Sequence, residues 1–415
     1  MVMNVIVYAL SVLMQLFVII IGLYHILVAV FAFIGDNKAK VLSDKKHRFA
    51  MVVAAHNEQT VISEIVDSLK DLDYDKDKYD IFVIADNCDD DTAKIAREHG
   101  ADVHERFSDG DRGKGYALNW MFGRIFEMDK QYDAICVFDA DNIVHKNFLN
   151  EMNVKFNQGF KAVQGYIDTK NPNDSWITAS YAISFWLLNK VYQTARSNLG
   201  LSNQISGTGF AVSTDIIKEY GWSATCLAED MEFTMQLVLN GISVGYAYDA
   251  IVYDEKPLTL SQSVKQRTRW MQGHADVASR FIPKLFKKAT KEKDILAFDC
   301  IIYLLQPTLL IMLLIITTVS LIKLFYPPLG MWFLTNLAIP PYLWNLVMIG
   351  QLLLTPFVLW VEGKLTKKMI MYYIPYLVYT YTWLPIAVVG VIRKNNKDWF
   401  HTEHTRKISA EDITH

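Results

Sequence analysis

Residues 134–141 read Ala-Ile-Cys-Val-Phe-Asp-Ala-Asp, five apolar residues followed by a pair of carboxylates. A short apolar run without polar residues at alternate positions is typical of a strand that is buried on both faces of a parallel sheet. Ligands of such sheets bind at the carboxyl ends of the strands. The stretch therefore predicts a buried strand with Asp139 and Asp141 at the edge of the sheet where a ligand binds.

Two earlier runs follow the same pattern. Residues 49–54 are apolar and lead through Asn57 and Glu58 into a helical pattern, and residues 79–85 end at Asp86 before a second helical pattern. Short apolar strands that alternate with helices predict an α/β fold with a doubly wound, mostly parallel sheet that is covered on both faces. Because the carboxyl ends of parallel strands meet at one edge, we expect these polar side chains to converge there.

Asp139 and Asp141 lie two residues apart, so at the end of an extended strand their side chains point the same way. Paired carboxylates repel each other unless a cation lies between them. Mg²⁺, or Mn²⁺ in its place, suits such a pair because it takes few protein oxygens and completes its coordination with phosphate and water. Asp-X-Asp also occurs in solvated loops, but its position directly after a buried strand favours a metal site.

Two further motifs each allow two interpretations. Lys114, between Gly113 and Gly115, offers a charge to a phosphate that approaches the backbone, or it simply enters a helix through a turn. Glu229 and Asp230 open a helical pattern, where acids act in catalysis or merely stabilise the helix start.

A third motif, Gln266-Arg267-Thr268-Arg269-Trp270, follows Pro257 on a further helical pattern. Arginine offers forked donors to a diphosphate, and tryptophan offers a flat apolar face to a sugar ring. The alternative is an amphipathic helix in the membrane interface with these side chains at the lipid headgroups, and both interpretations can hold together.

The composition indicates a membrane protein with a polar domain, because 52% of the residues are hydrophobic and only 20% are charged. Four stretches lack Asp, Glu, Lys and Arg, namely residues 5–34, 300–322, 324–361 and 369–392. Each exceeds the roughly 20 residues that cross a bilayer. The first is too long for a cleaved signal peptide and predicts an uncleaved anchor.

Basic residues orient the chain. Lysines and arginines cluster in residues 38–48 and 284–293, which places both flanks and the domain between them in the cytoplasm of a multi-pass cell-membrane protein. Three full crossings after residue 293 would put the tail outside, whereas its basic residues favour the inside. Pro375 and Pro385 interrupt the last stretch, so we expect it to kink or lie in the interface and leave a cytoplasmic tail.

Charge and cysteine usage exclude two other classes. The formal net charge of −3 offers no field for nucleic acid, so we expect no nucleic-acid partner. The four cysteines form no CxxC pair, which argues against a zinc site or a disulfide framework.

Taken in order, the motifs resemble those of membrane-embedded family 2 glycosyltransferases, the group of cellulose, chitin, hyaluronan and poly-N-acetylglucosamine synthases. The resemblance covers residues 48–282 and rests on Asn57-Glu58, Asp86, Asp139-Ala140-Asp141, Glu229-Asp230 and Gln266-Arg267-X-Arg269-Trp270. It implies a cytoplasmic GT-A-type (Rossmann-like) domain that takes a UDP-sugar donor.

The resemblance also implies roles for single residues. Asp230 would be the general base beside Glu229. The donor would be held by Asn57, Glu58, Asp86, Lys114, Asp139, Arg267 and Arg269, with Asp141 and Asp139 at the metal. The acceptor would meet Gln266, Trp270, Gly207 and Thr208, and the tail residues Trp399, Thr402 and His404 would cover the nucleotide. The acidic motif reads Ala-Glu-Asp where relatives often have Thr-Glu-Asp, which leaves the base intact.

These inferences divide the chain into five parts: an anchor with its basic flank (1–47), the glycosyltransferase domain (48–256), interfacial helices (257–294), membrane or interfacial helices (295–392) and a cytoplasmic tail (393–415). Within the domain, the aromatic segment 176–197 docks on the bilayer or, as we favour, packs in the core.

Three functions remain open at this point. The first is processive, inverting synthesis of a β-linked polysaccharide with export through the membrane. The second is transfer of one sugar to a lipid-linked acceptor, and the third, which the intact acids oppose, is a non-catalytic export or binding subunit. The donor sugar, the oligomeric state and any export partner cannot be read from the sequence.

Overall fold

The computed structural model describes residues 2–34, 42–222, 226–326 and 341–395. Its strands are β1 (Phe49–Ala55), β2 (Tyr79–Asp86), β3 (Asp102–Arg106), β4 (Ala134–Asp139), β5 (Ile143–Val144), β6 (Ala162–Thr169), β7 (Phe210–Ser213) and β8 (Val244–Asp254). Its helices before β8 are α1 (Val2–Val30), α2 (Ile62–Lys70), the 3₁₀ turn η1 (Lys76–Lys78), α3 (Thr92–Glu98), α4 (Lys114–Glu127), α5 (Phe148–Asn157), α6 (Trp176–Leu187), the π-helix η2 (Leu188–Thr194), α7 (Ala195–Leu199), α8 (Thr214–Tyr220) and α9 (Glu229–Leu239). After β8 come α10 (Leu260–Lys291), α11 (Ile295–Leu304), α12 (Gln306–Phe325), α14 (Pro341–Val361) and α15 (Lys367–Ile392).

The eight strands of the described residues form one sheet in the order β3-β2-β1-β4-β7-β6-β8-β5. The neighbours β3/β2, β2/β1, β1/β4 and β6/β8 are parallel, whereas β7 is antiparallel to both β4 and β6 and β5 is antiparallel to β8. The predicted α/β fold with a mostly parallel sheet is therefore confirmed. The antiparallel strands β7 and β5 are the parts that the apolar pattern did not predict.

Helices cover both faces of the sheet, as expected for strands that are apolar throughout. Alternate residues of β1 divide between the two cores: Met51 and Val53 face α2, α3 and α5, and Ala50 and Val52 face α4, α8 and α9. All four side chains are fully buried. Strands with no polar face thus need the two helical layers.

The register of β1, β2 and β4 brings the polar groups to one edge. Ala54 pairs with Asp139, and Ala55 pairs with Ala85, the residue before Asp86. The ends of three parallel strands are therefore level, and the turns that follow them meet at the same edge.

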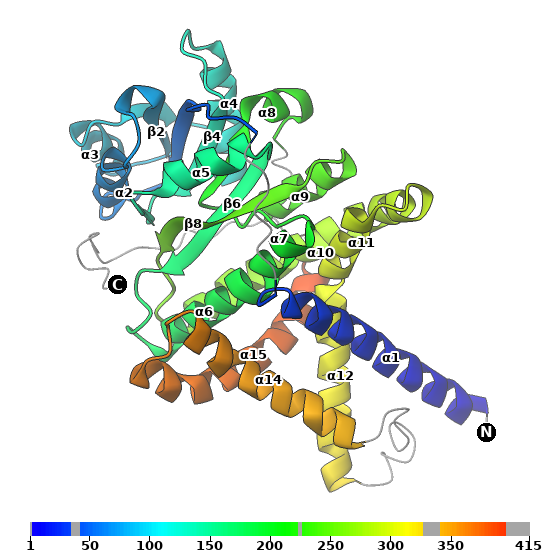
Figure 1. The fold of residues 1–415 in the computed structure, drawn as a ribbon. Coiled ribbons are helices and arrows are strands. Elements are labelled where there is room, and N and C mark those ends of the chain that lie inside the picture. The colour runs from blue at the N-terminus through cyan, green and yellow to red at the C-terminus, as the bar shows by residue number, and fades with distance from the viewer. Residues whose placement is uncertain (1, 35–41, 223–225, 327–340, 396–415) are drawn as a thin grey trace.

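The long helices α1, α12, α14 and α15 lie on one side of the sheet domain. Helices α6 and α10 lie between the sheet and these long helices (Figure 1). The segment 176–197 forms α6, η2 and α7, and most of α6 is buried against α15 and the strand residues Tyr166 and Tyr246. The segment was expected in the core of the domain itself, and the structure buries it at a boundary of that domain instead. It packs between the sheet and the C-terminal helices.

Helix α15 is tied to the domain side at both of its ends. Just before it begins, Lys364 donates to Asp168 of β6 over 2.9 Å, and Lys190 pairs with Glu362 at 3.1 Å. Where it ends, the side chain of Gln272 on α10 donates to the carbonyl of Arg393 over 3.1 Å. Helix α15 therefore begins beside β6 and η2 and ends beside α10.

A buried charge cluster attaches α1 to the domain. Arg196 of α7 donates from Nε and Nη2 to the carboxylate of Asp299 on α11, over 3.0 and 2.9 Å, and the hydroxyl of Tyr24 on α1 donates to the same carboxylate over 2.6 Å. Arg196 and Asp299 are at most 1% exposed. Both charges are therefore compensated where three elements meet.

The described residues contain two helices long and apolar enough to cross a membrane, Tyr8–Val30 and Lys367–Ile392. A third candidate is the pair Ile295–Leu304 and Gln306–Val319, which is bent by 43°. The apolar stretch 324–361 is not one helix, since α12 ends at Phe325 and α14 begins at Pro341. The apolar helices indicate that the protein associates with a membrane.

Gly390 lets α15 contact α10 at backbone distance, because a Cβ there would lie 2.9 Å from the carbonyl carbon of Met271. We expect Gly390→Ala to destabilise the protein by about 1–3 kcal/mol through overpacking. Gly350→Ala on α14, where a Cβ meets nothing within 4 Å, is the matched control. Thermal unfolding in detergent checks this, and equal stability of both variants would contradict the packing of α15 on α10.

Candidate active site

Asp86 lies at the end of β2 and is held by a buried ion pair. Nη1 of Arg106, at the end of the adjacent strand β3, lies 2.5 Å from its Oδ1, and the two side chains are 7% and 9% exposed. The ring Nδ1 of His56 lies 2.7 Å from the backbone carbonyl of Asp86. The carboxylate therefore stays in place without a ligand.

The turn after β1 carries the Asn57-Glu58 motif. Asn57 has φ +55°, a left-handed conformation that asparagine tolerates better than most residues, and its side-chain oxygen accepts from the backbone N–H of Asp89 over 3.0 Å. Glu58 is 8% exposed, and its N–H donates to Thr92 Oγ1 over 2.8 Å. The two loops at this edge of the sheet thus fix each other.

Asp139 and Asp141 have different surroundings. The Asp139 side chain is 40% exposed, and its backbone N–H donates to Asn142 Oδ1 over 3.0 Å and to Thr208 Oγ1 over 3.2 Å. Asp141 is 6% exposed, and its carboxylate accepts from the Asn142 amide over 3.2 Å and from the N–H of Glu255 over 3.3 Å. Asp139 is the more accessible carboxylate of the pair.

Lys114, the first residue of α4, lies between two parts of the site. Its Nζ lies 2.5 Å from Oδ1 of Asp139 and donates to the carbonyl of Gly207 over 2.7 Å. Burial opposes the charge of this lysine, but the carboxylates of Asp139, Glu229 and Asp230 outweigh it and raise the pKa of Lys114. Lys114 therefore stays charged, and it connects the end of β4 to the 206–209 turn.

Glu229 and Asp230 begin α9 beside this lysine. Burial raises the pKa of Glu229 to about 7, with a further contribution from the Asp230 carboxylate, while Lys114 and Arg269 oppose the shift. Burial also raises the pKa of Asp230, against the backbone N–H of Met231 and the charge of Lys114. A carboxylate whose pKa lies above its usual range accepts a proton more readily, which is the property of a general base.

The 206–209 turn approaches Asp230 directly. Gly207 has φ +83°, and a Cβ there would lie 3.5 Å from Oδ2 of Asp230. Gln164, which is 1% exposed, accepts from the Ser206 N–H over 2.8 Å and donates to the carbonyl of Thr208 over 2.9 Å. A buried amide thus fixes the turn at the predicted acceptor side.

The motif on α10 divides between two directions, since residues two apart on a helix point about 200° apart. Arg267 is fully buried, and its guanidinium lies over the rings of Tyr379 (4.2 Å) and Trp383 (5.0 Å) of α15. Arg269 lies close enough to Glu229 to lower the pKa of that carboxyl. In this arrangement Arg267 packs against α15 and Arg269 is the arginine beside the acids, while the implied contact of both with a donor diphosphate stays a prediction.

The other two residues of the motif contact α6. Gln266 accepts from the hydroxyl of Tyr181 over 2.9 Å, and the ring of Trp270 lies edge-on to Tyr181 at 6.1 Å and stacks on Trp383 at 6.4 Å. Trp270 therefore lies at the junction of the domain with α15.

The residues present fit a metal that the substrate helps to coordinate. Within the described part of the chain, no group of three or more His, Cys, Asp and Glu side chains is arranged to hold an ion. Mg²⁺ commonly uses one or two carboxylates and completes its shell with substrate phosphates. Asp139 and Asp141 would supply those carboxylates.

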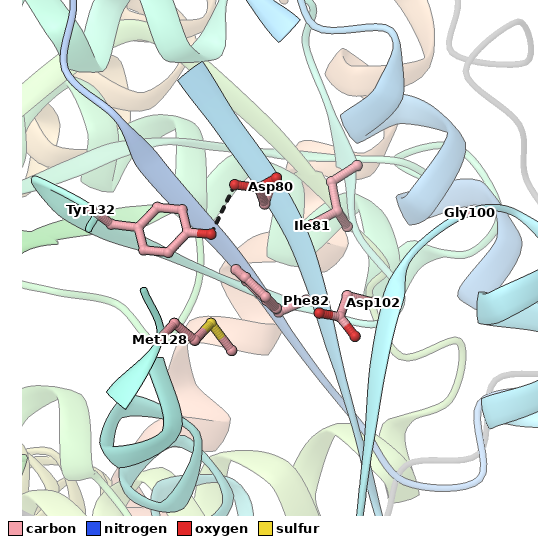
Figure 2. Close-up of a pocket in the computed structure, with 7 residues that line it drawn as sticks. All are labelled: Asp80, Ile81, Phe82, Gly100, Asp102, Met128 and Tyr132. Atoms are coloured by element: carbon pink, nitrogen blue, oxygen red, sulfur yellow. Dashed lines mark hydrogen bonds between the residues drawn. The ribbon is translucent and has the colours of Figure 1, made fainter. Parts of the chain in front are cut away.

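Other predicted residues and cavities lie away from this cluster. Trp399, Thr402 and His404 lie outside the described residues. A hollow of about 220 Å³ is lined by Asp80, Phe82, Asp102 and Tyr132 among others, and Figure 2 draws these side chains. It lies where β2 and β3 begin, at the opposite end of the strands from Asp86 and Asp139, away from the predicted donor site.

Sequence reasoning missed three residues that support the site: Arg106, Asn142 and Gln164. Asn142 directly follows the Asp-Ala-Asp motif, and Gln164 is a single amide inside the buried strand β6, so both left a local signal. Arg106 left none, because its pairing with Asp86 depends on strand order.

Comparison with known proteins identifies the family of this chain. A sequence model of the family described as "Glycosyltransferase like family 2" matches residues 47–273, more than half of the chain. The chain belongs to this family.

Curated relatives of this family 2 chain differ in their stated products. It is 29% identical over 253 residues to a probable glycosyltransferase of Bacillus subtilis (59% of each chain) and 27% identical over 237 residues to a beta-monoglucosyldiacylglycerol synthase of Synechocystis (54% of this chain, 47% of that one). It is 26% identical over 275 residues to a poly-beta-1,6-N-acetyl-D-glucosamine synthase of Staphylococcus aureus (65% of each). The matches thus span about half to two thirds of the length of these relatives.

Among solved structures, a mannosyltransferase of Pyrobaculum calidifontis in complex with GDP-mannose and Mn²⁺ is similar with a TM-score of 0.63. The match covers 93% of this chain and 98% of that one at 14% identity. This likeness confirms that the family 2 chain has a GT-A-like fold.

The raised pKa of Glu229 predicts a pH dependence of stability for the family 2 domain without donor. Between the ordinary glutamate value of about 4.3 and about 7, the folded protein holds a proton that the unfolded chain has lost, so stability falls as pH rises through this window. Glu229→Gln should remove this loss and be more stable than wild type at pH 8, by about 1–3 kcal/mol. Thermal unfolding at pH 5 and pH 8 measures it, and parallel pH profiles for both proteins would contradict the assignment.

Proposed function

We propose that the protein is an inverting glycosyltransferase that moves a sugar from a nucleoside diphosphate to an acceptor hydroxyl at the membrane surface. The observation that carries the proposal is Lys114, which joins the carboxylate of Asp139 to the turn beside Asp230. The carboxylate that would hold the donor and the candidate base therefore lie on either side of the Lys114 ammonium group. Membership of family 2 supports the same chemistry.

The donor would lie along the ends of β1, β2 and β4. Asn57, Glu58 and Asp86 would contact the nucleoside, and Asp139 and Asp141 would hold a divalent cation at the diphosphate. The cation would offset the negative charge that develops on the leaving diphosphate. Arg269 would add forked donors from its place near Glu229, and its Nε, like Nη2 of Arg267, is buried without a hydrogen-bond partner among the described residues.

Asp230 would act on the other side of the sugar. The acceptor oxygen attacks the anomeric carbon and its proton passes to Asp230, while the bond to the diphosphate breaks and the nucleoside diphosphate leaves with the bonding electrons. A single displacement inverts the anomeric centre, so an α-linked donor gives a β-linked product. General-base assistance of this kind contributes about 10²–10⁴-fold.

Two acceptor classes remain, a growing β-linked polysaccharide that is elongated processively and a lipid-linked acceptor that receives one sugar. The names of the relatives include both a polysaccharide synthase and a glycolipid synthase at similar identity. The aromatic junction of Trp270, Tyr181 and Trp383 supports a sugar or sugar-like acceptor. We therefore propose a hydroxyl acceptor that the membrane side of the domain presents.

The membrane placement belongs to the same proposal. We propose a multi-pass protein of the cell membrane with its catalytic domain in the cytoplasm, because the basic flanks of α1 and α11 favour that side. Contacts at both ends of α15 support an interfacial position for this helix and a cytoplasmic tail.

A donor panel tests the function. Purified protein is incubated with UDP- and GDP-sugars and Mg²⁺ or Mn²⁺, and nucleoside diphosphate and products are measured. Release with long product supports the polysaccharide synthase, release with a single-sugar lipid supports the glycolipid synthase, and no release with any donor would reject the enzyme.

Removing the base should separate turnover from binding. Asp230→Asn should lower kcat by about 10²–10⁴-fold, because the amide cannot take the acceptor proton, and should leave nucleotide affinity within twofold. Asp215→Asn on α8, whose side chain is 58% exposed, is the control. Steady-state rates and calorimetric titration of UDP measure both effects, and an active Asp230→Asn enzyme would remove Asp230 from the role.

The two arginines of α10 should behave differently. Arg269→Ala should lower kcat/KM for the donor by about 10²–10³-fold, as expected for a lost charge-stabilising donor. Arg267→Met, which replaces a buried cation against Tyr379, should change stability and leave UDP affinity unchanged. If Arg267→Met weakens UDP as much as Arg269→Ala, the role implied by the resemblance is right and the packing role is wrong.

A further inference from the structure

One buried amide, that of Asn142, uses all of its hydrogen-bonding positions inside the candidate site. The residue is fully buried. Its side-chain oxygen accepts from the Asp139 N–H over 3.0 Å and from the hydroxyl of Thr208. Its NH₂ group donates to Oδ1 of Asp141 over 3.2 Å and to Oδ1 of Asp254, the last residue of β8, over 3.4 Å. A side-chain amide offers two acceptor and two donor positions, so all four are used.

On the donor side, the Asn142 amide fixes the direction of the Asp141 carboxylate. Oδ1 of Asp141 accepts from the amide, and Oδ2 accepts from the N–H of Glu255 over 3.3 Å. The backbone carbonyl of Asp141 accepts from Nζ of the buried Lys170 over 2.8 Å. Rotation of the carboxylate would break the first two bonds. A carboxylate that coordinates a cation depends on such hydrogen bonds, because they orient it toward the ion.

On the acceptor side, the same amide holds the 206–209 turn through Thr208, whose hydroxyl donates to the Asn142 oxygen. Thr208 is 3% exposed, so water does not readily replace this partner. Gly207 of the same turn lies beside the candidate base, since a Cβ there would be 3.5 Å from Oδ2 of Asp230. The acids of the Asp-Ala-Asp motif and the turn beside the base therefore share one side chain.

A second buried amide holds the same turn without contacting the acids. Gln164 of β6 is 1% exposed, accepts from the Ser206 N–H over 2.8 Å and donates to the Thr208 carbonyl over 2.9 Å. Its hydrogen bonds within the described part of the chain all go to backbone groups, and none goes to Asp139 or Asp141. The two amides therefore allow a role in the turn to be separated from a role at the acids.

We propose that Asn142 is a positioning residue that couples the metal-dependent part of donor binding to the acceptor side of the site. Its NH₂ group orients Asp141 for a divalent cation, and its oxygen holds Thr208 in the turn beside Asp230. Loss of this amide weakens both functions, whereas loss of the Gln164 amide weakens only the acceptor side. The inference rests on the proposed glycosyl transfer, because it assumes a cation at the Asp-Ala-Asp motif.

Calorimetric titration of UDP and of GDP into the full chain, with and without Mn²⁺, tests the donor side without turnover. The ratio of the two dissociation constants for the tighter nucleotide is its metal factor. Asn142→Ala and Asn142→Ser should each lower this factor about tenfold, the lower end of the loss expected when a hydrogen bond that orients a metal ligand is removed. Binding without Mn²⁺ should stay within twofold, which also shows that the variants are folded. Gln164→Met is the matched control and should keep the metal factor of the wild type.

Steady-state rates with the acceptor that the wild type uses test the other side. Asn142→Ala and Gln164→Met should both raise the acceptor KM about fivefold, the value of roughly one hydrogen bond. The inference is wrong, and the transferase stands, if both Asn142 variants keep the metal factor, if Gln164→Met lowers it equally, or if Mn²⁺ does not tighten nucleotide binding to the wild type. If the wild type releases no nucleoside diphosphate from any donor, the proposed function fails instead, and the metal factor still decides the role of Asn142.

Discussion

The candidate site depends on the charge of Lys114. Asp139, Glu229 and Asp230 come from two elements that are about 90 residues apart in the sequence, and their carboxylates would repel one another in a partly buried site. One ammonium group compensates them and at the same time fixes the Gly207 carbonyl. Lys114 thus joins the end of β4 to the 206–209 turn, beside the hydrogen bond from the Asp139 N–H to Thr208 Oγ1.

Helices α10 and α15 contact the residues that surround this site. Gly273 of α10 lies so close to the loop before α9 that a Cβ there would be 2.6 Å from the Cβ of Ala228, the residue before Glu229. Two residues earlier, Met271 contacts Gly390 of α15. Successive close contacts thus connect α15, α10 and the start of α9, so the position of α15 bears on the geometry of Glu229 and Asp230. The small Ala228 in the Ala-Glu-Asp motif fits this close approach.

The sequence predicted the position of a residue where that position depends on its own strand or helix. It did not predict contacts between residues of different elements. Asp139 was correctly predicted at the end of a strand, because the apolar residues of a buried strand stop where the strand ends. The pairing of Asp86 with Arg106 could not be predicted, because it depends on which strands are neighbours. The motif on α10 was assigned one role for both arginines, but residues two apart on a helix point in nearly opposite directions, so Arg267 packs on α15 while Arg269 lies near Glu229. Gln164 acts through a turn 42 residues away, a distance that no local pattern spans.

The account as a whole requires one base on the side of the donor sugar opposite the leaving diphosphate. The most direct measurement of this claim is the anomeric configuration of the product, read by proton NMR after transfer from an α-linked nucleotide sugar. The account predicts a β-linked product, because a single displacement inverts the anomeric carbon. An α-linked product would show retention and would contradict the role assigned to Asp230.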